Sequence, residues 1–118
     1  MVEYSKGIDV LFHDALAKPL IETMEKIAYE EGNNVLSKVL FDIQDYHADT
    51  IEVAQIAKKS DVDLLVFYHL IPAPRNYISE KMFLRGVDDI LSNYYVSEDG
   101  TLVTLPASSD EILIDRIN

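Results

Sequence analysis

The sequence predicts an α/β fold, a mixed sheet flanked by helices, in a single domain covering residues 1–118. Two short and almost wholly apolar runs, at 8–13 and 64–69, are typical of strands covered on both faces. Segments with apolar residues at helical spacing separate them, and an Asp-Gly pair lies between two β-rich runs near the C-terminus. Because strands and helices alternate along the chain, we expect one mixed sheet with helices packed on it.

The composition supports a folded domain and excludes several kinds of chemistry. With 118 residues, of which 48% are hydrophobic, the chain is long enough for one modest core. It contains no cysteine, which rules out disulfides, thiolate zinc ligands and cysteine nucleophiles. A net charge of −11 repels phosphate backbones, so we do not expect this chain alone to bind nucleic acid.

No membrane contact or targeting segment is expected from the sequence. No apolar run approaches the ~18 residues of a membrane-spanning helix. There is also no basic segment followed by an apolar one, the pattern of a signal peptide. These features favour a cytoplasmic location.

The first half of the chain is predicted to form a strand followed by two helices. The strand at 8–13 comes first, and Pro19 suits the first turn of a helix, where its missing N–H costs nothing. Gly32 is a typical helix end. Either Asn33 or Asn34 can then cap a second, shorter helix.

The third helix, at 49–60, has the clearest start signal in the sequence. Asp49 stands three residues before Glu52, the spacing of a capping box, and Thr50 is a competing cap. This cap explains both acidic residues without any function. The apolar strand at 64–69 follows, and a proline-containing loop comes after it.

The C-terminal third is predicted to contain one helix and one hairpin. Residues 77–91 show helical spacing, weakened in the middle by Gly86. Within 93–105, the runs on either side of Asp99-Gly100 are expected to pair with each other around that turn. The last residues are expected to form an edge strand or a short helix.

Three histidines stand where predicted elements meet loops. His13 and His69 end apolar strands, and His47 precedes the third helix. If the two strands are parallel, these histidines emerge at one rim of the sheet, where ligands collect in open α/β folds. Imidazoles there suit a metal or proton transfer, and Asp14 can orient one ring. The alternative for each histidine is a hydrogen-bonded structural residue.

Three segments follow one another in a characteristic order: DVLFHDA, then YHADTIEVAQIAKKSDVDLLVFYHLIP, then FLRGVDDI…SEDGTLVTLP. They resemble the C-terminal half of metallo-β-lactamase-fold hydrolases, of the ribonuclease Z-like or arylsulfatase-like kind. In the ribonuclease Z-like branch a strand ends in His-Glu-Ala, a histidine turn opens an alanine-rich helix, and the next strand ends in a metal-binding histidine. The resemblance runs from about Ile8 to Pro106.

The resemblance implies a role for each candidate residue. His69 is similar to the last ligand of the family's two-metal centre, which usually holds zinc. His47 is similar to the histidine that acts on the scissile or leaving group. Asp14 stands where the family more often has the glutamate that orients this histidine. His13 matches a family histidine that is not a metal ligand. The implied chemistry is hydrolysis of an ester, lactam or phosphodiester by a metal-activated water.

Most of the family's metal ligands do not occur in this chain. It contains no His-x-His-x-Asp-His ligand loop and no Gly-Asp-Thr sequence with the family's bridging aspartate. The family's additional ligand histidine also has no counterpart in it. We therefore expect these residues to be inactive or incomplete on their own, because a two-zinc centre needs several ligands in fixed geometry. The family fold stacks two sheets, so half of it would expose an apolar face. We expect the chain to form a homo-oligomer or to need the missing N-terminal half.

Two functions from different classes remain open. The first is the C-terminal portion of a zinc-dependent hydrolase that acts on a phosphodiester or another small-molecule ester. The second is a non-catalytic acidic α/β module for binding or oligomerisation. A doubly wound nucleotide-binding domain is disfavoured, because the four glycines are isolated and form no phosphate loop.

Overall fold

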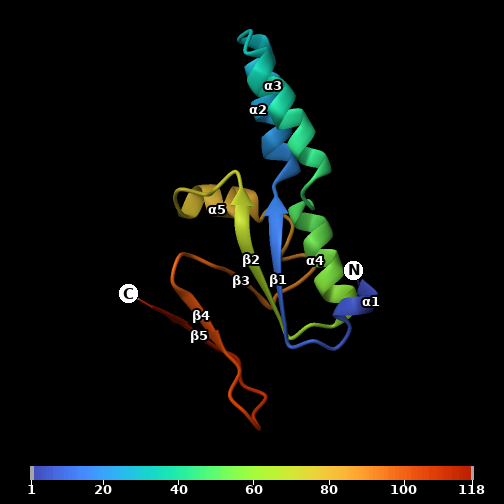
Figure 1. Cartoon of the computed structure of the whole chain (residues 1–118), viewed down its shortest axis with the longest axis vertical. Coiled ribbons are helices and arrows are strands. Elements are labelled where there is room, and N and C mark those ends of the chain that lie inside the picture. The colour runs from blue at the N-terminus through green and yellow to red at the C-terminus, as the bar shows by residue number, and fades with distance from the viewer. Residues whose placement is uncertain (1, 118) are drawn as a thin grey trace.

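A three-stranded parallel sheet, in the order β1–β2–β3, forms the centre of the molecule (Figure 1). The computed structural model describes residues 2–117. The strands of this sheet are β1 (Val10–Leu16), β2 (Leu64–Ile71) and β3 (Tyr94–Val96). A second, antiparallel pair, β4 (Thr101–Thr104) and β5 (Leu113–Arg116), lies to one side of it. The α/β class is confirmed, but the strands form two sheets instead of one mixed sheet.

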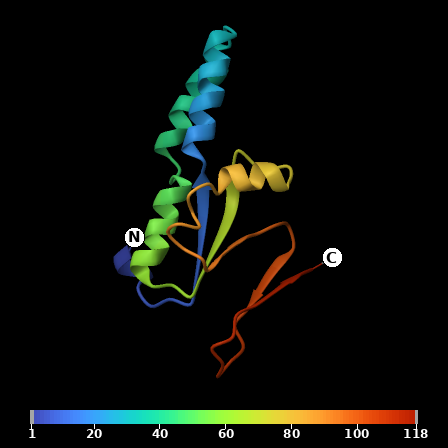
Figure 2. The ribbon, with the colours of Figure 1, turned by 180° about the vertical axis from the view of Figure 1, so that it is seen from behind.

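The helices are distributed unevenly around the parallel sheet. They are α1 (Val2–Ser5), α2 (Lys18–Glu30), α3 (Asn34–Asp42), the 3-10 turn η1 (Ile43–Asp45), α4 (Thr50–Ser60) and α5 (Tyr77–Phe83). The α2–α3 hairpin projects beyond the ends of β1 and β2, at the top of Figure 1. Seen from behind, α5 crosses in front of the end of β2 (Figure 2). The molecule is therefore elongated, with extents of 57 × 36 × 22 Å.

The helix starts follow the local sequence closely. Pro19 lies in the first turn of α2, as predicted. Asn33 caps α3 by accepting a hydrogen bond from the N–H of Leu36 at 3.1 Å. Asp49 caps α4, but its carboxylate accepts from the N–H of Ile51 at 3.1 Å, one residue short of the expected capping-box position.

The core lies between the sheet and the two helices on one of its faces. Leu11, Leu65 and Phe67 point to this side and pack against Val53 of α4 and Phe83 of α5, among others. Apolar burial of this kind is the main stabilising term for a domain of this size. The opposite face of the sheet is less covered: Phe12 is 54% exposed, and Tyr68 is exposed as well. Figure 1 looks onto this second face.

The predicted hairpin within 93–105 is wrong. The run at Tyr94–Val96 pairs in parallel with β2, and the run at Thr101–Thr104 pairs with β5 instead. Tyr94 and Val96 pack against the main core from that position, so pairing with β2 gains apolar burial that a hairpin would not provide. The C-terminal run forms an edge strand, one of the two alternatives expected for it.

Three element boundaries also differ from the prediction. The helix predicted for 77–91 ends at Phe83, and turns follow around Gly86, whose φ of +90° suits glycine. Strand β1 continues past His13 to Leu16, and β2 continues past His69 to Ile71. Among the residues from 2 to 117, no helix combines the length and the apolar character that crossing a membrane requires.

Candidate functional site

Asp14, His47 and His69 come together at one end of the parallel sheet. Asp14 lies on β1, His69 lies near the end of β2, and His47 follows η1 in the loop that leads to α4. The parallel pairing of β1 and β2 brings the first two to the same rim. Each of the three residues offers a ligand atom within 4.8 Å of the other two. The predicted convergence of His47 and His69 is therefore found.

His69 owes its position to an irregularity in β2. Tyr68 pairs with Asp14 and Leu70 pairs with Ala15, so His69 is an extra residue that has no partner in the register. Its φ of +47° lies in the left-handed region, which residues with a side chain seldom adopt. Such a bulge turns a side chain away from the regular alternation of a strand. In this way the exposed His69 ring reaches the side of the sheet where Asp14 lies.

His47 and Asp14 form a close polar pair. His47 Nδ1 lies 2.7 Å from Asp14 Oδ2, and both side chains are largely shielded from solvent. Because an ionised carboxylate has no hydrogen to donate, the imidazole N–H donates to Asp14. This bond fixes the ring so that Nε2 points away from Asp14. The pair joins a strand residue to a loop residue 33 positions later.

His13 also contacts Asp14, but it does not join the cluster. Its Nδ1 lies 2.7 Å from the carbonyl oxygen of Asp14 and 3.2 Å from Asp14 Oδ1. The carboxylate of Asp14 is thus held between two imidazoles. This arrangement agrees with a structural role for His13, the alternative that the sequence left open for each histidine.

Asp14, His47 and His69 offer the oxygen and nitrogen atoms that metal ions such as zinc bind. Zinc is commonly bound by histidine nitrogen and carboxylate oxygen. Two ligand atoms on one tetrahedral zinc lie about 3.3 Å apart, given metal–ligand distances of about 2.0–2.1 Å. The 2.7 Å contact between His47 and Asp14 is shorter and is a hydrogen bond. His47 Nδ1 and Asp14 Oδ2 therefore do not both bind one metal ion, whereas His47 Nε2 and the His69 ring remain as candidate ligands.

The rings of His47 and His69 are close neighbours. Their centroids lie 5.6 Å apart, with an angle of 69° between the ring planes. A group held by His69 would therefore lie within reach of a molecule that also touches His47. The two rings therefore belong to one small site.

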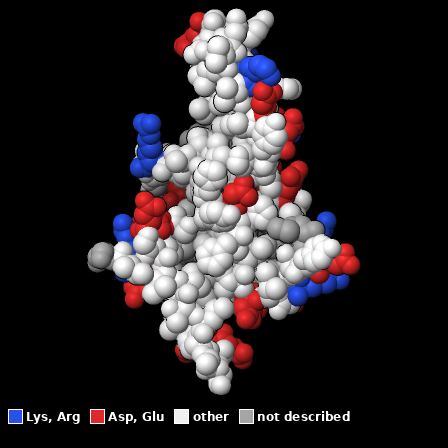
Figure 3. All heavy atoms as spheres, in the orientation of Figure 1, with Lys and Arg blue, Asp and Glu red and all other residues white. Residues whose placement is uncertain are grey.

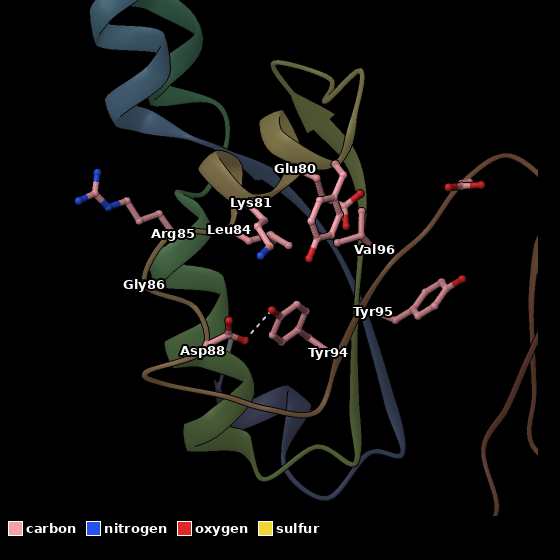
Figure 4. Close-up of a pocket in the computed structure, with 11 residues that line it drawn as sticks. Glu80, Lys81, Leu84, Arg85, Gly86, Asp88, Tyr94, Tyr95 and Val96 are labelled. Atoms are coloured by element: carbon pink, nitrogen blue, oxygen red, sulfur yellow. Dashed lines mark hydrogen bonds between the residues drawn. The ribbon is translucent and has the colours of Figure 1, made fainter.

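A cavity lies elsewhere, between α5 and β3. Its volume is about 740 Å³, and it contains none of the three histidines. Figure 4 shows Glu80, Lys81 and Asp88 around it, with Tyr94 donating a 2.7 Å hydrogen bond to Asp88. Burial, with this bond as the second cause, raises the pKa of Tyr94 to about 12. The sequence did not single out this cavity, because tertiary packing creates it and no motif marks it.

Comparisons with known proteins do not identify a family for this chain. A scan against protein-family models and a search of curated proteins each found no match. The function must therefore be argued from the site itself.

Proposed function

We propose that this chain carries the proton-transfer pair and one metal ligand of a zinc-dependent hydrolase, acting on a phosphodiester or another ester. The observation that carries the proposal is the 2.7 Å contact between His47 Nδ1 and Asp14 Oδ2, made beside His69. An imidazole held by a carboxylate is a common general acid and base in enzymes. The resemblance to the C-terminal half of metallo-β-lactamase-fold hydrolases points to the same residues.

In this proposal His47 handles the proton of the leaving group. Its Nδ1–H donates to Asp14, which leaves Nε2 directed toward a bound ester. When His47 is protonated, Nε2 gives a proton to the departing oxygen, and Asp14 stabilises the imidazolium. Asp14 is a positioning residue in this scheme, because it acts through His47.

His69 is the proposed zinc ligand from this chain. A catalytic zinc needs about three protein ligands, so the remaining ones would come from outside these 118 residues. When bound, zinc supplies a Lewis acid that polarises the ester and activates water. The exposure of His69 at the rim leaves it accessible to such a completing segment.

A zinc titration tests the metal ligand. Zinc added to the ¹⁵N-labelled chain should perturb the side-chain nitrogen signals of His69 first. We expect His69→Ala to abolish zinc binding and His47→Ala to leave it within about twofold, because the proposal gives His47 the role of proton donor and not of ligand. His13→Ala is the matched control. Equal losses in the His47 and His69 variants would show a three-ligand site instead.

The His47–Asp14 pair has a separate test. The ¹⁵N shifts of His47 should report a protonated Nδ1 in the parent chain. Asp14→Ala should shift the ring toward the mixed tautomers of a free histidine, whereas Asp14→Glu should retain the Nδ1–H form. Retention of that form in Asp14→Ala, with the fold intact, would argue against the positioning role.

A non-catalytic acidic module for oligomerisation is the second candidate. The observation in its favour is the number of large apolar side chains left exposed, among them Phe12 on the open face of the sheet. A folded chain that shows no zinc-dependent shift of any histidine, even at millimolar zinc, would favour this candidate over the hydrolase.

A further inference from the structure

The α2–α3 hairpin has one apolar face built by both helices. Ala28 of α2 and Leu40 of α3 are buried in the cluster between the helices. At about 100° per residue, Met24 and Ile27 lie on the same side of Ala28 around the axis of α2. Val39 lies on the corresponding side of Leu40 around the axis of α3. Because the two helices are antiparallel neighbours, those sides coincide on a single face.

We call this surface the hairpin face. Its residues are aliphatic and are 42–78% exposed: Met24, Ile27, Val35, Leu36 and Val39. In Figure 3 the charged side chains of the hairpin lie along its right side and at its tip, while its left side is uncharged. The spacing places one charged residue, Glu31, on this face, at the tip. An exposed apolar surface shared by two helices is unusual unless something covers it.

The hairpin face continues at its base onto α5. Ile78 and Met82, one helical turn apart on α5, are both more than half exposed. Met82 and Leu20 of α2 line the same small cavity of about 120 Å³, so this side of α5 meets the base of α2. Figure 1 shows α5 to the left of the base of the hairpin, and we call the apolar surface of Leu20, Ile78 and Met82 at this junction the apolar corner.

The two ends of this surface carry opposite charges. The hairpin tip is acidic, with Glu30 and Glu31. The loop before α5, at the base, carries the exposed Arg75. Figure 3 shows anionic atoms at the tip and cationic atoms at the outer end of α5, both on the left of the view. A second molecule that runs antiparallel to the first would place the acidic hairpin tip of each copy against the positively charged hairpin base of the other.

We propose that a second copy of this chain covers the hairpin face. A two-fold axis near Met24, the middle of α2, makes the hairpins antiparallel and completes a four-helix bundle. The tip of each hairpin then enters the apolar corner between α2 and α5 of the other copy. The contact is isologous, so the hairpin face of each copy packs on the apolar corner of its partner in the same way.

The area of the hairpin face is compatible with a second copy of the chain covering it. The five side chains of the hairpin face expose on the order of 400 Å² per copy, within the range of a functional patch. With α5 and the charged ends included, two copies would bury on the order of 1,000–1,200 Å², the lower end of specific interfaces. The dimer is therefore expected to dissociate on dilution. It does not depend on the proposed metal chemistry.

Sedimentation velocity over a concentration series tests the proposal. The parent chain should sediment as a dimer at high concentration, and Ile27→Glu/Val39→Glu should be monomeric with unchanged circular dichroism. The matched control is Tyr29→Glu/Phe41→Glu, two even more exposed apolar positions on the same helices but outside the hairpin face. The control should remain dimeric. A monomeric parent, or a dimer broken only by Phe12→Glu on the open sheet face, would overturn the proposal.

Cross-linking tests the antiparallel arrangement. Because the chain lacks cysteine, Met24→Cys introduces a single thiol, which should oxidise rapidly to a covalent dimer near the two-fold axis. Tyr29→Cys should not. Glu31→Arg and Arg75→Glu should each weaken the dimer, and the two changes combined should restore it. Failure of the combined variant to recover would contradict the antiparallel arrangement.

Discussion

At the scale of single residues, the backbone at His69 decides how the site is assembled. In a regular strand His69 would point to the face opposite Tyr68, but the bulge and the φ of +47° redirect it. A non-glycine residue in this conformation costs free energy, of order 1–3 kcal/mol. Such strain tends to occur where function requires it, and here it brings His69 next to His47.

Tyr94 offers a residue-scale prediction that depends on pH. Burial and the bond to Asp88 raise its pKa to about 12, so the folded state favours the neutral phenol. The stabilisation is fully present below pH 10, where the unfolded phenol ionises, and is lost as the pH rises to about 12. The free energy of unfolding should therefore decrease between pH 10 and 12. In Tyr94→Phe this decrease should be smaller.

Denaturant unfolding at several alkaline pH values measures that stability. Ultraviolet absorbance of tyrosinate follows the titration directly, as the difference between the parent chain and Tyr94→Phe. Asp88→Asn should lower the pKa of Tyr94, because it removes the negative charge next to the hydroxyl. A difference spectrum centred near pH 10 would show that Tyr94 is solvated.

At the scale of secondary-structure elements, short-range signals placed the starts of the longer helices well and the C-terminal strands poorly. Pro19, Asn33 and Asp49 mark helix starts that the structure confirms, because a cap satisfies backbone groups within a few residues. The Asp99-Gly100 pair favours a turn, but it does not say which strand each flanking run joins. Long-range partners, β2 and β5, decided that.

Asp49 allows a prediction about α4. Its carboxylate accepts hydrogen bonds from the N–H groups of Ile51 and Lys18, so it ties the start of α4 to the start of α2. We expect Asp49→Ala to lower the free energy of unfolding by about 1–2 kcal/mol. Glu52→Ala should cost less than about 1 kcal/mol, because only its charge near the helix start is lost. Equal losses in urea denaturation would instead indicate a reciprocal capping box.

At the scale of the whole molecule, the parallel sheet is covered unequally on its two faces. Helices α4 and α5 bury one face, whereas exposed aromatic side chains remain on the other. Together with the hairpin face, this leaves two apolar surfaces on a chain of 118 residues. Both agree with the expectation that the chain associates with another polypeptide, which stays a prediction.

Two phenylalanines on neighbouring strands allow the difference in burial between the two faces of the sheet to be tested. Phe67 is fully buried and Phe12 is 54% exposed. We expect Phe67→Ala to reduce the free energy of unfolding by about 3–5 kcal/mol, through lost burial and a cavity. Phe12→Ala should cost less than about 1 kcal/mol in dilute solution. Similar costs, measured by urea unfolding at low protein concentration, would mean that the open face is covered.

The sequence by itself determined the α/β class, the starts of the first three long helices and the identity of Asp14, His47 and His69 as candidates. These features depend on periodicity, caps and residue chemistry, which act over a few positions. Only the tertiary structure decided the parallel register of β1 and β2, the bulge at His69 and the pairing of His47 with Asp14. It also decided the separation of β3 from β4 and the shared apolar side of the hairpin. Each of these depends on contacts between residues far apart in the chain, whose free energy local sequence patterns do not contain.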